Sequence, residues 1–78
     1  MATEDTMKSA ILETIPGADV TVGPGSGGGH FTISVVSPVY DGKSMLDSQR
    51  LVLGAIAHLM KGDGAPVHAI DKLTTKKV

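Results

Sequence analysis

The spacing of hydrophobic residues along the chain predicts two amphipathic helices and three short strands. Residues 3–15 carry apolar side chains at helical intervals and stop at a Pro-Gly pair, so they predict a first helix. A second, longer helix is predicted over residues 44–60, where Ser44 can cap the first turn. Apolar side chains on alternate positions predict strands over residues 18–22, 30–37 and 67–73.

The connections between these elements determine how the strands pair. The first two strands are joined by a loop alone and are expected to be antiparallel, whereas the second and third are joined through a helix and are expected to be parallel. The predicted fold is therefore α/β (α+β) in the order α-β-β-α-β, with both helices on one face of a three-stranded mixed sheet. A single domain is predicted over residues 1–78. Its ends are expected to be frayed, over about residues 1–3 and about residues 75–78, with Thr74 as the first residue of the frayed tail.

Two segments carry more specific expectations. The run GPGSGGG at residues 23–29 is rich in glycine and is predicted to be a loop, outside any helix or inner strand. The second helix is expected to bury one apolar stripe and to keep its polar face in solvent. The residues expected in that stripe are Met45, Val52, Leu53, Ile56, Leu59 and Met60.

Composition limits what such a chain can do. A protein of this length buries only about 60% of its unfolded surface, so we expect one core, no substrate-enclosing cavity and no enzymatic activity. The formal net charge of −1 gives no overall attraction to nucleic acid or to an acidic membrane. The absence of cysteine excludes disulfides, thiol catalysis and an autonomous cysteine-rich metal site. No apolar run approaches the roughly 20 residues that span a bilayer, so a cytoplasmic protein is expected, with the nucleus and organelles left open.

Two histidines stand at the entrances of predicted strands. His30 opens the second strand and His68 lies near the start of the third. Adjacent parallel strands begin at the same end of a sheet, roughly 5 Å apart, so both imidazoles are expected at one edge. Imidazole binds transition metals and replaces thiolate in some iron–sulfur sites, so this pair predicts a metal cluster held jointly with a partner that supplies sulfur. The alternative is that each histidine is an ordinary polar residue at a strand end, as we expect for His58 on the helix surface.

Two glycine-containing patterns imitate phosphate-binding loops but stand in the wrong context. Residues 23–28 satisfy G-x-G-x-x-G, which binds dinucleotides only between a strand and a helix, whereas a strand follows here. Gly42-Lys43-Ser44 imitates the end of a P-loop, but Ser37 stands where the earlier glycine is required. The first pattern is therefore interpreted as a plain loop and the second as a turn before a helix cap.

Several short runs, each weak alone, occur in an order and spacing that resemble the BolA-like family, from about Met7 to Thr75. The runs are His30-Phe31, Val35-Val36-Ser37, Tyr40-Asp41-Gly42-Lys43-Ser44, Gln49-Arg50 and Val67-His68-Ala69-Ile70. The resemblance implies a small α/β domain related to the class II KH arrangement, which agrees with the element order above. The chain departs from the family pattern in the glycine-rich loop, in a short C-terminal segment, and at Lys72, where many members have an apolar residue.

The resemblance also implies a function. Members of the family bind monothiol glutaredoxins and share a 2Fe–2S cluster with them, for iron-sulfur trafficking to recipient apo-proteins or for iron sensing. In the shared cluster the glutaredoxin and glutathione contribute thiolates. The histidine of the His-Ala-aliphatic motif, here His68, matches the signature ligand, and His30 fits the position of the second ligand. The implied function is a non-enzymatic adaptor that holds a cluster only in the complex.

Two other functions stay open. Some members of the family regulate transcription, and a KH-like fold permits nucleic-acid binding. The basic residues that could form a strip for nucleic acid are Lys43, Arg50, Lys72, Lys76 and Lys77. With a net charge of −1, a solvated charged face is the simpler interpretation of these residues. The remaining possibility is a protein-interaction module in which the cluster is incidental.

Overall fold

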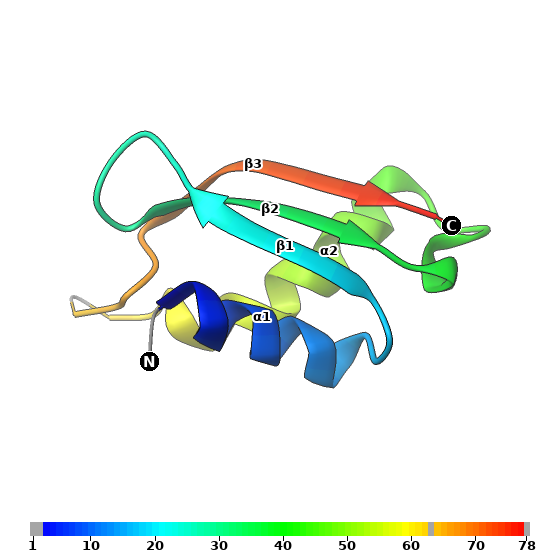
Figure 1. Cartoon of the computed structure of the whole chain (residues 1–78), viewed down its shortest axis with the longest axis horizontal. Helices are drawn as coiled ribbons and strands as arrows, with labels where there is room; N and C mark the ends of the chain where they lie inside the picture. The colour runs from blue at the N-terminus through cyan, green and yellow to red at the C-terminus, as the bar shows by residue number, and fades with distance from the viewer. Residues whose placement is uncertain (1–2, 63, 78) are drawn as a thin grey trace.

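In the computed structural model, which describes residues 3–62 and 64–77, two helices cover one face of a three-stranded sheet (Figure 1). The elements are α1 (Thr3–Thr14), β1 (Asp19–Pro24), β2 (His30–Val36), a 3-10 turn (Pro38–Tyr40), α2 (Met45–Ile56), a second 3-10 turn (Ala57–Leu59) and β3 (Ala69–Lys76). The α-β-β-α-β order and the mixed sheet predicted from the sequence are confirmed. None of the described helices has the length and apolar character needed to cross a membrane.

Both helices begin with the local chemistry that helices favour. The hydroxyl oxygen of Ser44 accepts a hydrogen bond from the backbone N–H of Asp47 at 3.1 Å, so Ser44 caps α2 as predicted. In α1, Glu4 and Asp5 lie in the first turn, where the helix dipole stabilises negative charge. Gly17 follows α1 with a φ of 78°, and this left-handed residue turns the chain toward β1.

The sheet has β2 at its centre, antiparallel to β1 and parallel to β3. Along β3 the pairing with β2 contains one irregularity. Phe31 pairs with Ile70, whereas the next residue of β2, Thr32, pairs with Lys72. Asp71 is therefore an extra residue on β3, and a β-bulge interrupts the ladder at this point.

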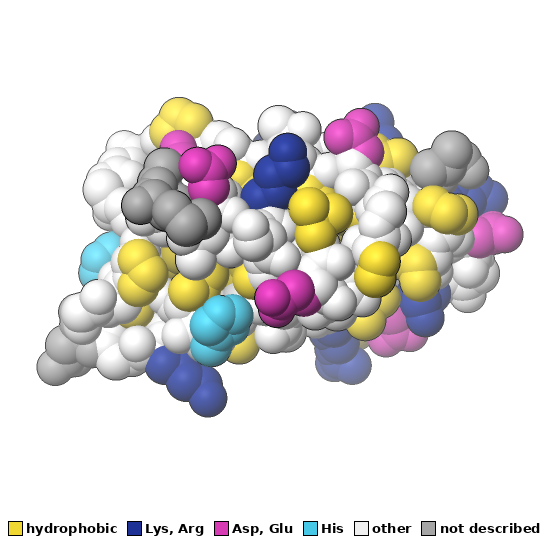
Figure 2. All heavy atoms as spheres, turned by 60° about the horizontal axis from the view of Figure 1, so that its bottom comes forward, with side chains coloured by type: hydrophobic (Ala, Val, Ile, Leu, Met, Phe, Trp, Pro, Cys, Tyr) yellow, Lys and Arg dark blue, Asp and Glu magenta, His cyan; other side chains and the backbone are white. Residues whose placement is uncertain are grey.

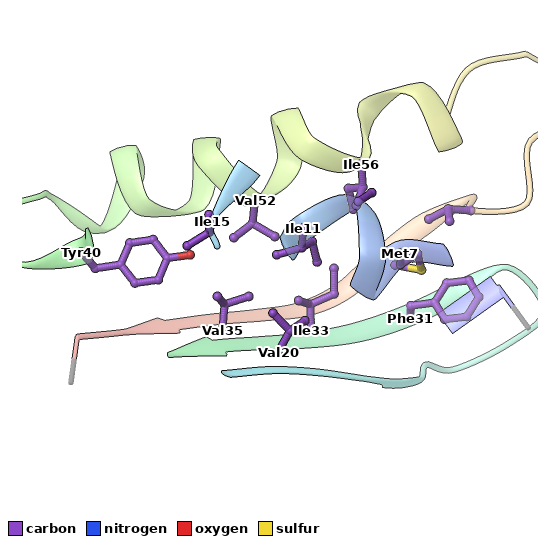
Figure 3. Packing of buried hydrophobic residues seen from close by; sticks show 12 residues of the cluster. Met7, Ile11, Ile15, Val20, Phe31, Ile33, Val35, Tyr40, Val52 and Ile56 are labelled. Atoms are coloured by element: carbon purple, nitrogen blue, oxygen red, sulfur yellow. The ribbon is translucent and has the colours of Figure 1, made fainter. Parts of the chain in front are cut away.

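The core fills the space between the sheet and the two helices (Figure 3). Buried side chains alternate along β2 at Phe31, Ile33 and Val35, so one face of this strand is apolar as predicted. Burying an aliphatic side chain fully contributes about 1.5–3 kcal/mol, and such residues dominate this core. The side chains with the least exposure are Met7, Ile11, Val35, Val52, Ile56 and Val67.

The buried side of α2 is narrower than the sequence predicts. Its buried residues are Ser48, Val52 and Ile56, each four positions from the next. Met45 is 71% exposed and Leu53 is 39% exposed, so the prediction that they are buried is wrong. Met45 is the first residue of the helix and lines a surface hollow. Leu53 lies about 100° around the helix from Val52, so the two residues cannot face the core equally.

β3 spans Ala69–Lys76, so it begins two residues later and ends three residues later than the predicted strand over residues 67–73. It continues to Lys76, so the expectation that the tail frays from Thr74 is wrong for the strand. These residues go on pairing with the last residues of β2 after the bulge. The backbone N–H of Ser37 extends the ladder with a 2.9 Å hydrogen bond to the carbonyl of Lys76. The partner strand therefore orders a segment whose own sequence gives a weak strand signal.

β1 and α1 also differ from the prediction at their ends. β1 continues to Pro24, so the first two residues of the glycine-rich run belong to a strand. Proline fits there because β1 is an edge strand with no second ladder to supply. Thr3, which was expected to fray, begins α1. The fraying predicted for residues 1–2 and 78 lies outside the described residues.

Candidate functional site

The two histidines singled out from the sequence stand at the start of neighbouring parallel strands. His30 is the first residue of β2 and pairs with Ala69, the first residue of β3, and His68 directly precedes Ala69. Both histidines therefore lie at the same end of the sheet, beside the loop that joins β1 to β2 (left in Figure 1). The side chain of His30 is 38% exposed and His68 is exposed, so neither imidazole belongs to the hydrophobic core.

Backbone contacts fix His68 against the loop. Its N–H donates a 2.7 Å hydrogen bond to the carbonyl of Gly29, and the N–H of Ala69 donates to the same oxygen at 3.2 Å. Gly29 has a φ of 77°, in the left-handed region that favours glycine. A Cβ at Gly29 would also overlap Cδ2 of the His68 imidazole. A residue without a side chain is therefore needed here for two independent reasons.

Asp71 connects His30 to the same loop. One carboxylate oxygen, Oδ1, lies 2.8 Å from Nδ1 of His30, and the other, Oδ2, accepts a 2.6 Å hydrogen bond from the backbone N–H of Ser26. The hydrogen bond with His30, followed by those with Ser26, lowers the pKa of Asp71 from 3.8 to about 2. The carboxylate is therefore ionised throughout the neutral pH range.

The pattern of the sequence does not single out Asp71, because the position of Asp71 depends on the bulge. In an uninterrupted ladder Asp71 would pair with Thr32, but the bulge removes it from the pairing. The periodicity of hydrophobic residues gives no signal for such an insertion. The only sequence signal is an acidic residue shortly after His68, within a strand that is otherwise apolar, basic or hydroxylated.

The metal-binding types of side chain at this end of the sheet are the two imidazoles and the carboxylate of Asp71. Among the described residues, the ring of His30 bonds Asp71 through Nδ1, and no hydrogen bond to Nε2 is found. In the part of the chain that the structure describes, no three His, Cys, Asp or Glu residues are grouped so that they could hold a metal ion. A metal centre at this edge would therefore need ligands from another molecule.

The basic residues considered for nucleic-acid binding lie on different sides of the molecule. Lys72 and Lys76 are on the sheet face away from the helices, because their partners in β2 alternate with its buried residues. Arg50 belongs to α2, on the opposite side. Lys43 and Lys77 line a surface hollow of about 270 Å³ at the other end of the sheet from the histidines. On the helical face in Figure 2, the described basic side chains are interspersed with acidic ones and form no continuous patch.

A buried hydroxyl distinguishes the end of the sheet that lies away from the histidines. Tyr40, in the 3-10 turn after β2, is 4% exposed, and its ring lies at one end of the hydrophobic cluster in Figure 3. Its hydroxyl oxygen has no hydrogen-bond partner among the described residues. Burial raises the pKa of Tyr40 above its ordinary value of 10.0, because the charged phenolate would lose its hydration.

The fold and the site define a class of small two-layer α/β domain with accessible imidazoles at one end of a mixed sheet. A family model described as BolA-like protein matches residues 7–77. The chain therefore belongs to the BolA-like family.

Solved structures of BolA proteins have the same fold. A bolA protein homologue from Coxiella burnetii matches with a TM-score of 0.73 and 28% identity, covering 99% of this chain and 92% of that one. A bol-like protein from Babesia bovis matches with a TM-score of 0.71 and 30% identity, covering 96% and 86%. BolA1 from Arabidopsis thaliana, at 17% identity, has a TM-score of 0.77 over 99% and 93% of the two chains and is similar in fold. The comparison with curated proteins gives no significant match.

Proposed function

We propose that this chain is a non-enzymatic adaptor that binds a monothiol glutaredoxin and shares a 2Fe–2S cluster with it. The adaptor would take part in iron-sulfur trafficking to recipient apo-proteins or in iron sensing. The observation that carries the proposal is the parallel pairing of β2 and β3, because it brings His30 and His68 to one accessible edge. Membership of the BolA-like family supports the same function. The recipient proteins and a cytoplasmic location stay predictions.

The donor set of the chain fits a shared cluster better than a resident one. The chain has no cysteine, so thiolates for such a cluster would come from the glutaredoxin and glutathione. His68 and His30 are the residues that would hold the cluster from this side, each through a ring nitrogen. When bound, the cluster would supply a redox-active group whose potential histidine ligation generally raises.

The test is a reconstituted complex with a monothiol glutaredoxin and glutathione under anaerobic conditions. We expect His68→Ala to weaken or alter the cluster, seen as changed visible absorption and circular dichroism, and His30→Ala to do so if it is the second ligand. His58→Ala is the matched control, since His58 is exposed in the 3-10 turn after α2. Spectra of the His68→Ala complex that equal those of the wild type would contradict the proposal.

A second titration separates the adaptor from a simple interaction module. The chain is titrated with glutaredoxin that lacks the cluster and with glutaredoxin that carries it. An adaptor is expected to bind the loaded form more tightly, because its histidines then contribute ligands. Equal affinity for both forms, together with unchanged spectra, would favour the module.

A further inference from the structure

The hydrogen bonds of Asp71 can be given a direction from chemistry alone. The backbone N–H of Ser26 can only donate, so Oδ2 of Asp71 accepts its bond at 2.6 Å. An ionised carboxylate has no proton to give, so in the 2.8 Å contact with Oδ1 the donor is Nδ1 of His30. Both oxygens of Asp71 are therefore acceptors.

This direction determines the tautomer of the neutral His30 ring. If Nδ1 carries the proton, Nε2 carries the lone pair that a metal ion binds. Nε2 has no hydrogen-bond partner among the described residues, and the side chain is 38% exposed, so no described protein group occupies this lone pair. A free histidine side chain prefers the opposite tautomer, with the proton on Nε2. Asp71 thus works against the intrinsic preference of the ring.

Three features of the backbone keep Asp71 in place. The β-bulge takes Asp71 out of the regular pairing with β2. The bond from Ser26 anchors the second carboxylate oxygen, so rotation of the group away from His30 would break this bond. Gly25 leaves the necessary space, because a Cβ there would lie 2.7 Å from Oδ2 and 2.9 Å from Cβ of His30. The loop, the bulge and the imidazole form one connected unit.

We propose that Asp71 is a positioning residue that makes Nε2 of His30 the metal-binding nitrogen. The inference rests on the proposed function, because a cluster shared with a partner is what Nε2 would bind. Metal-binding histidines commonly donate their other ring N–H to a carboxylate, and loss of such a partner typically costs about 10–100-fold in metal affinity. Asp71 has this relation to His30 before any metal is bound.

The substitution Asp71→Asn separates positioning from a purely structural role. The amide oxygen of asparagine can still accept the bond from Ser26, which keeps the loop attached. Its NH2 group then faces Nδ1 of His30 and can only donate, so Nδ1 becomes the acceptor and the proton moves to Nε2. The variant is nearly identical in shape, retains the loop contact and reverses the tautomer. Asp19→Asn is the matched control, because Asp19 is exposed at the end of β1 that pairs with the far end of β2.

The first measurement needs no metal. Long-range proton–nitrogen correlation spectra of the 15N-labelled protein, recorded well above the ordinary imidazole pKa of about 6.5, report which ring nitrogen carries the proton. We expect mainly Nδ1–H for His30 in the wild type and in Asp19→Asn, and mainly Nε2–H in Asp71→Asn. A wild-type ring that is mainly Nε2–H, or a tautomer unchanged in Asp71→Asn, would overturn the inference.

The second measurement uses the complex with a monothiol glutaredoxin, glutathione and the cluster. We expect Asp71→Asn to lower the cluster affinity of the complex by about tenfold or more, and Asp19→Asn to leave it unchanged. If His30→Ala changes the cluster but Asp71→Asn does not, the positioning role is overturned while the proposed function stands. If the wild-type complex holds no cluster, the proposed function fails, and the tautomer measurement still decides whether Asp71 orients the ring.

Discussion

The two ends of the sheet are built on different principles. At the histidine end, hydrogen bonds of 2.6–2.8 Å connect His30, Asp71 and Ser26, and another of 2.7 Å connects His68 to Gly29. At the far end, the hydroxyl of Tyr40 is buried without a partner among the described residues. The first end holds the Asp71 carboxylate against the His30 imidazole through side-chain hydrogen bonds, whereas the second combines backbone hydrogen bonds with burial of the Tyr40 ring. A region that positions side chains needs such directional contacts, because hydrophobic burial has no direction.

The far end also carries a contrasting ion pair. Nζ of Lys77 lies 3.5 Å from Oδ1 of Asp41, and the two side chains are 68% and 75% exposed. Water and salt screen a pair of this kind, and it leaves both side chains free to move. The bond between His30 and Asp71 joins less exposed groups, and its carboxylate is anchored a second time by Ser26. The difference predicts that substitutions at the histidine end have larger effects.

The largest effect is expected for Gly29→Ala. Alanine at this position must keep the left-handed backbone conformation, and its Cβ would collide with the His68 ring. We therefore expect a loss of about 2 kcal/mol or more in the free energy of unfolding. Gly17→Ala, with a φ of 78° and nothing within 4 Å of the added Cβ, tests the backbone cost alone. Gly27→Ala has neither problem. In denaturant unfolding we expect the loss in free energy of unfolding to be largest for Gly29→Ala, smaller for Gly17→Ala and smallest for Gly27→Ala. Equal losses for Gly29→Ala and Gly17→Ala would show that the contact with the His68 ring is unimportant.

The next effect concerns the pH dependence of stability through Asp71. The pKa of its carboxyl is lowered from 3.8 to about 2 in the folded protein. The ionised carboxylate therefore stabilises the fold fully above about pH 4, and this contribution to the free energy of unfolding is lost as the pH falls toward 2. We expect Asp71→Asn to be less stable than the wild type above pH 4 and the two to converge toward pH 2. Unfolding midpoints measured at a series of pH values check this. A difference that does not shrink in acid would show that the charge of Asp71 is unimportant for folding.

A smaller effect of opposite sign is expected for Tyr40→Phe. The substitution removes a buried hydroxyl that lacks a partner, so stability should stay the same or rise by about 1 kcal/mol. The raised pKa of Tyr40 also predicts that the wild type loses stability as the pH rises above 10, because the unfolded state then releases its proton more readily. The Tyr40→Phe variant should lose less stability than the wild type above pH 10. Destabilisation by Tyr40→Phe at neutral pH would point to a partner for the hydroxyl.

The smallest effect is expected for Lys77→Ala. An exposed ion pair contributes about 0.5 kcal/mol or less, and added salt should abolish the difference from the wild type. Unfolding at low and high ionic strength measures it. A loss above 1 kcal/mol that persists in salt would mean that this end is held by more directional contacts than the structure indicates.

The sequence predicted well what depends on local pattern. The alternation along β2, the Ser44 cap of α2 and the order of the elements all follow from periods and cap residues within a few positions of each other. The placement of His30 and His68 at the same end of the sheet also follows from the sequence, because a helix between β2 and β3 favours a parallel connection. The family resemblance used the same residues and is confirmed by the match over residues 7–77.

The tertiary structure alone decided those features that depend on contacts with residues far away in the sequence. β3 extends to Lys76 because β2 offers it a partner, and Met45 is exposed because α2 buries a narrower stripe than its apolar residues suggest. The bulge that brings Asp71 to His30 is a shift of register between two strands, and the pattern of one strand does not encode it. The sequence by itself therefore determined which residues stand at the edge of the sheet, and long-range packing decided how those residues are oriented.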